Sequence, residues 1–172
     1  ELSQSSVVVG VREAANQPNI LGLTGAGQTV GVMDSGLDTG NLATLALDVR
    51  GRVAVDPAIT NGWADNVSGH GTHVIGIIAS DGSSRPAGNI RGMVPKASIF
   101  FNRVLGDPKD TRSLTTSWQD AYNVGARSHS NSWGGGLGNQ YDTGSVDIDR
   151  FVLSHDDFVF VKSAGNRGPN NN

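Results

Sequence analysis

The chain has 172 residues, and 13 Lys plus Arg against 16 Asp plus Glu give it a net charge of −3. A mildly acidic chain lacks the basic excess that neutralises phosphate, which argues against nucleic acid as a partner. It holds no run of roughly 18 apolar residues, which argues against a membrane span, and the absence of cysteine excludes disulfides, thiol catalysis and thiolate zinc sites. The length predicts a single domain.

Short β-rich runs alternate with helical faces along the chain. In chain order the sequence predicts a strand over Thr29–Met33, a helix over His70–Ala79, a strand over Ala97–Val104, a surface loop over Leu105–Leu114, a helix over Ser117–Ala126, a strand over His129–Trp133, a helix over Val146–Leu153 and a strand over Phe158–Val161. This alternation is typical of an α/β fold with parallel strands and crossover helices. In such a sheet, functional side chains collect where the strands end.

Two polar side chains follow apolar strands at such positions. Asp34 stands between an apolar run and a glycine turn, where an acid alone is often a turn former or helix cap. Asn166 lies in the segment Ser163–Gly168, where a carboxamide can donate to a developing oxyanion or simply tolerate a left-handed backbone. Either residue indicates a catalytic site only in combination with other motifs.

A pair of histidines, His70 and His73, lies three residues apart at the predicted start of a helix. One interpretation makes one imidazole a general base that Asp34 holds in the correct tautomer. The other makes both histidines metal ligands, with Asp34 as the third. No Glu follows His70, so the His-Glu-x-x-His pattern of metalloproteases is absent.

Four motifs occur in the order Asp-Ser-Gly (34–36), Gly-His-Gly-Thr-His-Val-x-Gly (69–76), Asn-Ser-Trp-Gly (131–134) and Ser-Ala-Gly-Asn-x-Gly-Pro (163–169). Together they resemble the subtilisin-like serine peptidases from about Gly22 to Pro169. The phrases around Trp133 and Asn166 are similar to the oxidant-resistant alkaline bacterial branch. The resemblance implies a three-layer α/β sandwich with a mostly parallel sheet, of which residues 1–172 are the N-terminal portion of one peptidase domain.

The resemblance also implies roles for individual residues. Asp34 matches the triad aspartate, His70 the general base, His73 a structural position and Asn166 the oxyanion donor. The matched substrate-binding residues are Leu105, Gly106, Ser132, Trp133, Gly134, Ala164 and Gly165. The resemblance implies a serine endopeptidase that acts on proteins or peptides and needs no cofactor for its chemistry. It also implies a secreted, extracellular protein with an inhibitory propeptide as a partner. Calcium is common in the family, and Asp38, Asp48 and Asp65 are candidate ligands that the sequence does not distinguish from surface acids.

One departure from the family stands out. The nucleophilic serine belongs to a Gly-Thr-Ser motif, yet the only Gly-Thr here is Gly71-Thr72, inside the histidine motif. We therefore expect the fold to be incomplete because its C-terminal part is absent, the strand at Phe158–Val161 to be an exposed edge, and a complementary C-terminal fragment to carry the serine. The chain alone is expected to be inactive.

Two other functions stay open at this point: a catalytically inactive peptide-binding or scaffold fragment, and a metal-dependent hydrolase built on Asp34, His70 and His73. Dinucleotide binding by Gly25-x-Gly27 is excluded, because these glycines precede the strand at Thr29 instead of following it. The remaining histidines, His129 and His155, are expected at the surface, and Trp63 and Trp118 in the core.

Overall fold

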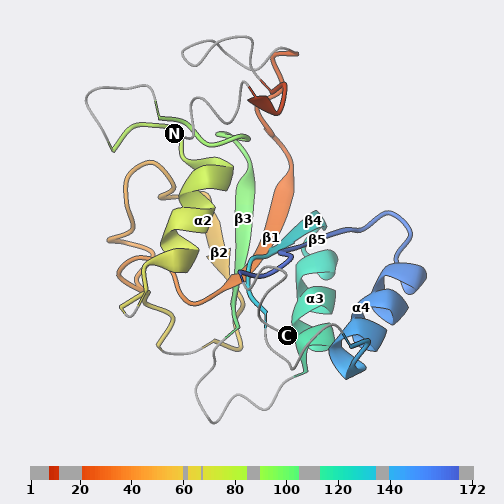
Figure 1. Cartoon of the computed structure of the whole chain (residues 1–172). Helices are drawn as coiled ribbons and strands as arrows, with labels where there is room; N and C mark the ends of the chain where they lie inside the picture. Colours follow the sequence, from red (N-terminus) through yellow and green to blue (C-terminus); the bar gives the residue numbers. More distant parts are fainter. Residues whose placement is uncertain are drawn as a thin grey trace.

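The structure is a computed structural model that describes residues 8–11, 21–59, 62–66, 68–84, 90–104, 113–134 and 140–166. Five strands of this part of the chain form one sheet in the order β2–β3–β1–β4–β5, and every neighbouring pair is parallel (Figure 1). The strands are β1 (Thr29–Asp34), β2 (Val53–Val55), β3 (Ser98–Arg103), β4 (Ala126–Asn131) and β5 (Val159–Lys162), and the helices are α2 (His70–Ala79), α3 (Leu114–Asn123) and α4 (Thr143–Ser154).

The helices cover both faces of the sheet, α2 on one side and α3 and α4 on the other (Figure 1). Alternation along the central strand β1 supplies both cores, since successive side chains point to opposite faces. Val32 packs with Ile75 of α2, whereas Met33 packs with Trp118 of α3 and Phe151 of α4. The predicted α/β three-layer architecture with a parallel sheet is therefore confirmed.

Most predicted elements are present, with differences at their ends. Helix α2 has the predicted bounds, but β2 was not predicted, because three residues show too little pattern. Residues 105–112 of the predicted loop lie outside the described residues, and its last residue, Leu114, opens α3 instead of ending a loop. The helix starts there because Ser113 is its N-cap, whose side chain accepts a hydrogen bond from the Thr116 backbone N–H.

His129 is fully buried, so the expectation of a surface position is wrong. The residue lies on β4, which β1 and β5 flank, and its ring stacks on Phe160 with centroids 6.1 Å apart. Gly31 of β1 lies directly beneath the ring, where an added Cβ would collide with it. Desolvation by this burial lowers the pKa of His129 to about 4. His155 is half-buried, and its ring stacks on that of Phe151 with centroids 4.2 Å apart.

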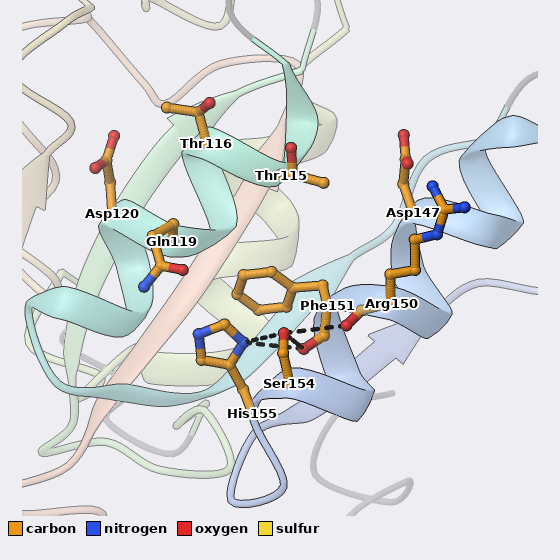
Figure 2. A pocket seen from close by; sticks show the side chains of 9 residues that line it. All are labelled: Thr115, Thr116, Gln119, Asp120, Asp147, Arg150, Phe151, Ser154 and His155. Atoms are coloured by element: carbon orange, nitrogen blue, oxygen red, sulfur yellow. Dashed lines mark hydrogen bonds between the residues drawn. The ribbon is translucent and has the colours of Figure 1, made fainter.

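A groove of about 410 Å³ lies between α3 and α4 (Figure 2). Its lining residues are Thr115, Thr116, Gln119, Asp120, Asp147, Arg150, Phe151, Ser154 and His155. None of the predicted site residues is among them.

The two edge strands of the described sheet are β2 and β5. The predicted edge strand is β5. Its Val159 and Val161 side chains are exposed, at 60% and 51%. This agrees with the expectation of an exposed edge strand at this position. Among the described residues, no helix is long and apolar enough to cross a membrane.

Candidate active site

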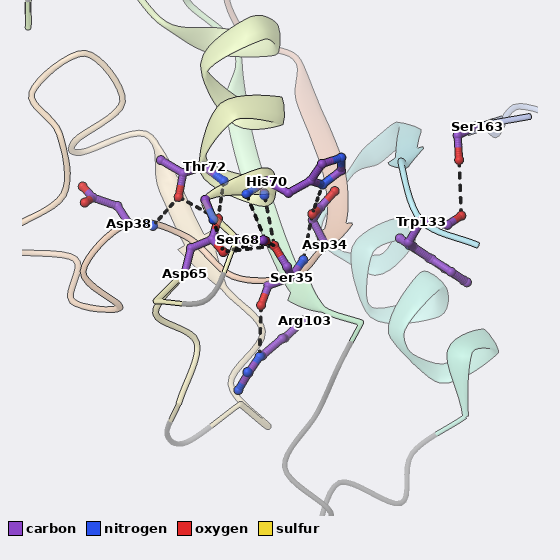
Figure 3. A network of polar contacts seen from close by, with 12 residues as sticks. Asp34, Ser35, Asp38, Asp65, Ser68, His70, Thr72, Arg103, Trp133 and Ser163 are labelled. Carbon is purple, nitrogen blue, oxygen red and sulfur yellow. Dashed lines mark hydrogen bonds and ion pairs between the residues drawn. The ribbon is translucent and has the colours of Figure 1, made fainter. Parts of the chain in front are cut away.

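A buried carboxylate and an accessible imidazole form the centre of the site. The His70 Nδ1 atom lies 2.6 Å from Asp34 Oδ1, and the side chains are 51% and 2% exposed, respectively. A carboxylate at this distance accepts the proton on Nδ1, which leaves Nε2 as the acceptor of the ring. The structure therefore brings together the two residues that the sequence predicts as triad aspartate and general base (Figure 3).

The local sequence explains this geometry. Asp34 ends β1 on the same face as Val32, which is the face that α2 covers, and His70 is the first residue of α2. Gly69 provides the helix N-cap with a left-handed backbone, φ 66°. Gly71 then passes so close to the turn after β1 that an added Cβ would collide with the carbonyl oxygen of Gly36, two residues beyond the strand. Two glycines thus allow the start of α2 to approach the end of β1.

The start of α2 is held by side chains from outside the helix. Gly69, its N-cap, has no side chain with which to cap it, but Asp65 accepts hydrogen bonds from the backbone N–H groups of Gly69 and Thr72 at 3.1 and 2.9 Å. Desolvation by partial burial would raise the pKa of Asp65, but hydrogen bonds from Thr72, Ser35 and Gly69 outweigh it and hold this pKa below its ordinary value. From the sequence, Asp65 was predicted only as a candidate calcium ligand, because a capping residue is expected immediately before the helix.

A second group of predicted residues gathers where β4 and β5 end. The Ser163 N–H donates to the Asn131 carbonyl at 3.2 Å, and the Ser163 hydroxyl donates to the Trp133 carbonyl at 3.3 Å (Figure 3). Lys162 lies over the Trp133 ring, 4.4 Å from Nζ to the ring centroid, and desolvation lowers the pKa of this lysine. These contacts hold Trp133, from the predicted segment Ser132–Gly134, against Lys162 and Ser163, which precede the other predicted residues, Ala164 and Gly165.

The remaining site residues differ in what the structure says of them. Asn166 is exposed and follows β5 at the carboxyl edge of the sheet, the edge at which Asp34 ends β1. No hydrogen bond within the described part of the chain joins Asn166 to the dyad. The predicted residues Leu105 and Gly106 lie outside the described residues.

The geometry does not support a metal centre on the two histidines. Within the described residues, no group of three or more His, Cys, Asp or Glu side chains could hold a metal ion, and Asp34, His70 and His73 all belong to these residues. Two of the candidate calcium ligands, Asp38 and Asp65, share one hydrogen-bond network, in which the Thr72 hydroxyl accepts from the Asp38 N–H and donates to Asp65, whereas Asp48 binds other partners. The Ala46 N–H donates to Asp38, and the Ser80 and Ser84 hydroxyls donate to Asp48.

Chemically, this arrangement can serve as a general base with a fixed tautomer. A buried carboxylate on Nδ1 orients the imidazole and stabilises the imidazolium that forms when Nε2 takes up a proton. Such a pair is suited to activate a hydroxyl nucleophile.

We compared the sequence and the structure with those of known proteins. The sequence profile of the Subtilase family matches residues 25–172. The chain is 30% identical over 157 residues to the serine protease/ABC transporter B family protein tagA of Dictyostelium discoideum, covering 86% of this chain and 9% of that protein. It is 39% identical over 97 residues to Subtilisin E of Bacillus subtilis, covering 56% and 23%, respectively.

Among solved structures, the crystal structure of MycP1 with its N-terminal propeptide removed is similar, with a TM-score of 0.59 and 28% identity over 85% of this chain and 45% of that chain. The chain spans less than half the length of each of these three relatives. The family profile covers most of the chain, and the order of motifs predicted the same relationship. The chain therefore belongs to the subtilase family of serine peptidases.

Proposed function

We propose that this chain is the N-terminal portion of one serine endopeptidase domain and contributes the acid–base half of its Asp-His-Ser triad. Asp34 orients and stabilises His70, and His70 is the general base. The observation that carries the proposal is the 2.6 Å contact between His70 Nδ1 and the buried Asp34 Oδ1, combined with the accessibility of the His70 side chain.

In this mechanism a serine hydroxyl attacks the carbonyl carbon of the scissile peptide bond while His70 Nε2 takes the hydroxyl proton. The tetrahedral oxyanion accepts a hydrogen bond from the Asn166 carboxamide. Collapse of the intermediate expels the amine, which leaves with the proton that His70 held. Water then hydrolyses the acyl-enzyme with the same base, and serine and imidazole return to their first state.

The serine comes from a complementary C-terminal polypeptide in this proposal. The 172 residues contain no Gly-Thr-Ser motif. The exposed Val159 and Val161 on the edge strand β5 offer a surface that such a segment would cover. An inhibitory propeptide is a further partner, supported by the similarity to MycP1, whose structure was determined after its propeptide was removed.

Substrate is a protein or peptide bound in extended form. The backbone near Leu105 and Gly106 would pair with it as an added strand, and Ser132, Trp133, Gly134, Ala164 and Gly165 would line the site beside the scissile bond. The hydrogen bonds that join the Trp133 and Ser163 segments support this grouping. Secretion, and membership of the oxidant-resistant alkaline branch, are part of the same proposal.

The test is intact mass spectrometry under denaturing conditions after the native preparation reacts with a fluorophosphonate. A second polypeptide that carries the adduct is the expected result. His70→Ala should abolish labelling, whereas His73→Ala, the matched control three residues along the exposed side of α2, should keep it. A chelator should have no effect on either result.

Two results would overturn the proposal. Peptide binding without labelling in the native preparation would indicate an inactive scaffold. Hydrolysis that survives fluorophosphonate but stops with a chelator would indicate metal chemistry.

A further inference from the structure

Asp65 receives an unusual concentration of hydrogen bonds for a half-buried carboxylate. Oδ1 accepts from the Ser35 hydroxyl at 3.0 Å, the Ser68 hydroxyl at 3.4 Å and the Gly69 N–H at 3.1 Å. Oδ2 accepts from both the N–H and the hydroxyl of Thr72, at 2.9 and 3.0 Å. Ser35, Gly69 and both Thr72 groups donate to Asp65, and the single proton of the Ser68 hydroxyl lies within reach of both Asp65 Oδ1 and Ser35 Oγ, the latter at 3.1 Å. Only an ionised carboxylate accepts from these donors together.

The result is a helix start in which no N–H group lacks a partner. The first N–H groups of a helix have no partner within it. In α2 those of Gly69 and Thr72 bind Asp65, that of His70 binds the Ser68 hydroxyl at 3.2 Å, and that of Gly71 binds the Ser35 hydroxyl at 3.1 Å. The Ser35 hydroxyl in turn donates to Asp65, and the Ser68 hydroxyl has both Ser35 Oγ and Asp65 Oδ1 as acceptors.

Ser35 connects this network to the dyad. Its N–H donates to Asp34 Oδ1 at 2.7 Å, the same oxygen that binds His70 Nδ1. Its hydroxyl accepts from the N–H of Gly71, the residue that follows His70. The hydroxyl can accept there because its own proton is directed to Asp65 (Figure 3). A closed ring thus joins Asp34, Ser35, Gly71 and His70, and Asp65 fixes the orientation of its serine.

We propose that Asp65 is a positioning residue of the dyad, which holds the His70 imidazole on Asp34 through the Ser35 hydroxyl and the first turn of α2. Asp65 contacts neither Asp34 nor His70 directly in any of these hydrogen bonds, so it acts through other residues and is not itself catalytic. The inference rests on the proposed role of His70 as general base. It adds a second carboxylate on which the geometry of that base depends.

A simple helix cap or a calcium ligand would explain part of the same geometry, and these roles predict different behaviour. If Asp65 were only a helix cap, its loss would destabilise α2. The His70–Asp34 hydrogen bond would then weaken no more than it does when the protein is equally destabilised elsewhere. A calcium ligand would respond to added calcium or to a chelator. The positioning role requires that the effect on His70 pass through Ser35.

The readout is the NMR signal of the His70 Nδ1 proton and its exchange with water, measured on the whole native preparation. Asp65→Asn keeps the size but offers donors where acceptors are needed, and we expect exchange to become on the order of tenfold faster. Asp142→Asn is the matched control. Asp142 caps α4, where its side chain accepts from the Ser145 N–H at 2.9 Å, so this variant makes the same change of carboxylate to amide at a helix start far from the dyad in sequence and should leave the His70 signal unchanged.

Ser35→Ala tests the path and remains informative where Asp65→Asn fails to fold, because it leaves the Asp65 carboxylate on the helix. It should also accelerate exchange, and Asp65→Asn should add little in its background. Equal effects of Asp65→Asn and Asp142→Asn, or an undiminished effect of Asp65→Asn without Ser35, would overturn the inference. The signal needs no turnover, so failure of the endopeptidase proposal would appear separately, as a His70 proton that behaves as expected in a protein that fluorophosphonate does not label.

Discussion

The buried His129 should make the protein lose stability on mild acidification. In the folded state its pKa is lowered from 6.5 to about 4 by desolvation. Above the unfolded value both states are neutral and pH has no effect. As the pH falls from 6.5 towards 4, the unfolded chain takes up the proton first, so folding stability decreases, and below about 4 both states are protonated and the loss is complete.

The magnitude follows from the two pKa values. Each unit of pKa difference is worth about 1.4 kcal/mol in the free energy of unfolding, so the complete loss is about 3 kcal/mol. Between pH of about 7.5 and about 5 the loss is about 2 kcal/mol. The residues packed around the ring, Gly31, Phe158 and Phe160, carry no charge that would offset this loss. Asp65, Asp142 and Asp157 have lowered pKa values and lose their contributions at lower pH, as the pH falls through those values.

Urea unfolding at these two pH values, followed by tryptophan fluorescence, tests the reasoning. The variant His129→Leu keeps a similar volume without a titrating group. The unfolding free energy of the wild-type protein should fall by about 2 kcal/mol more than that of the variant. An equal loss in both proteins would refute the assignment of the acid sensitivity to His129.

Three further predictions concern the site. Asp34→Asn should slow fluorophosphonate labelling by about four orders of magnitude, because the imidazole loses its correct tautomer, and unchanged labelling rates would contradict the dyad. Asn166→Ala should lower kcat by about 10² to 10³ with little change in KM, as for the matching donor in subtilisin. Steady-state peptide hydrolysis measures both parameters, and a rise in KM as large as the fall in kcat would argue against an oxyanion role. Gly71→Ala should cost about 1–3 kcal/mol in urea unfolding, because its Cβ would collide with the Gly36 carbonyl. Gly76→Ala, on the same helix but with open space around the added Cβ, should instead be neutral or slightly stabilising.

Local patterns predicted those parts of the fold whose causes are local. Helix α2 has its predicted bounds because a glycine-rich entry and Asp81-Gly82 delimit an apolar face. Helix α3 ends at Asn123 rather than Ala126 because Gly125 adopts φ +94°, a turn that the sequence permits but does not require. Strand β2 was missed because only its pairing with β3 identifies it as a strand, and β3 lies more than forty residues later in the sequence.

The site shows the same division. Asp34, His70 and Asn166 were predicted from motifs, and the structure brings the first two into contact. The role of Asp65 was missed because it depends on Ser35 and Thr72, which reach it from two different segments. The burial of His129 was missed because a strand's neighbours on both sides, here β1 and β5, decide whether a polar residue is covered.

The parallel sheet has a consequence for how the protein folds. No two neighbouring strands are joined by a tight hairpin: Thr29 of the central strand pairs with Ser98 on one side and Ala126 on the other. Every strand pairing must therefore close a long loop before it gains any stabilisation, and such topologies fold slowly and leave apolar strands open to aggregation meanwhile. During synthesis β1 emerges before the other strands of the described sheet, and it has no partner strand until β3 follows, more than sixty residues later. A bound partner that shields β1 during this interval would raise the yield of folded protein without changing its final stability.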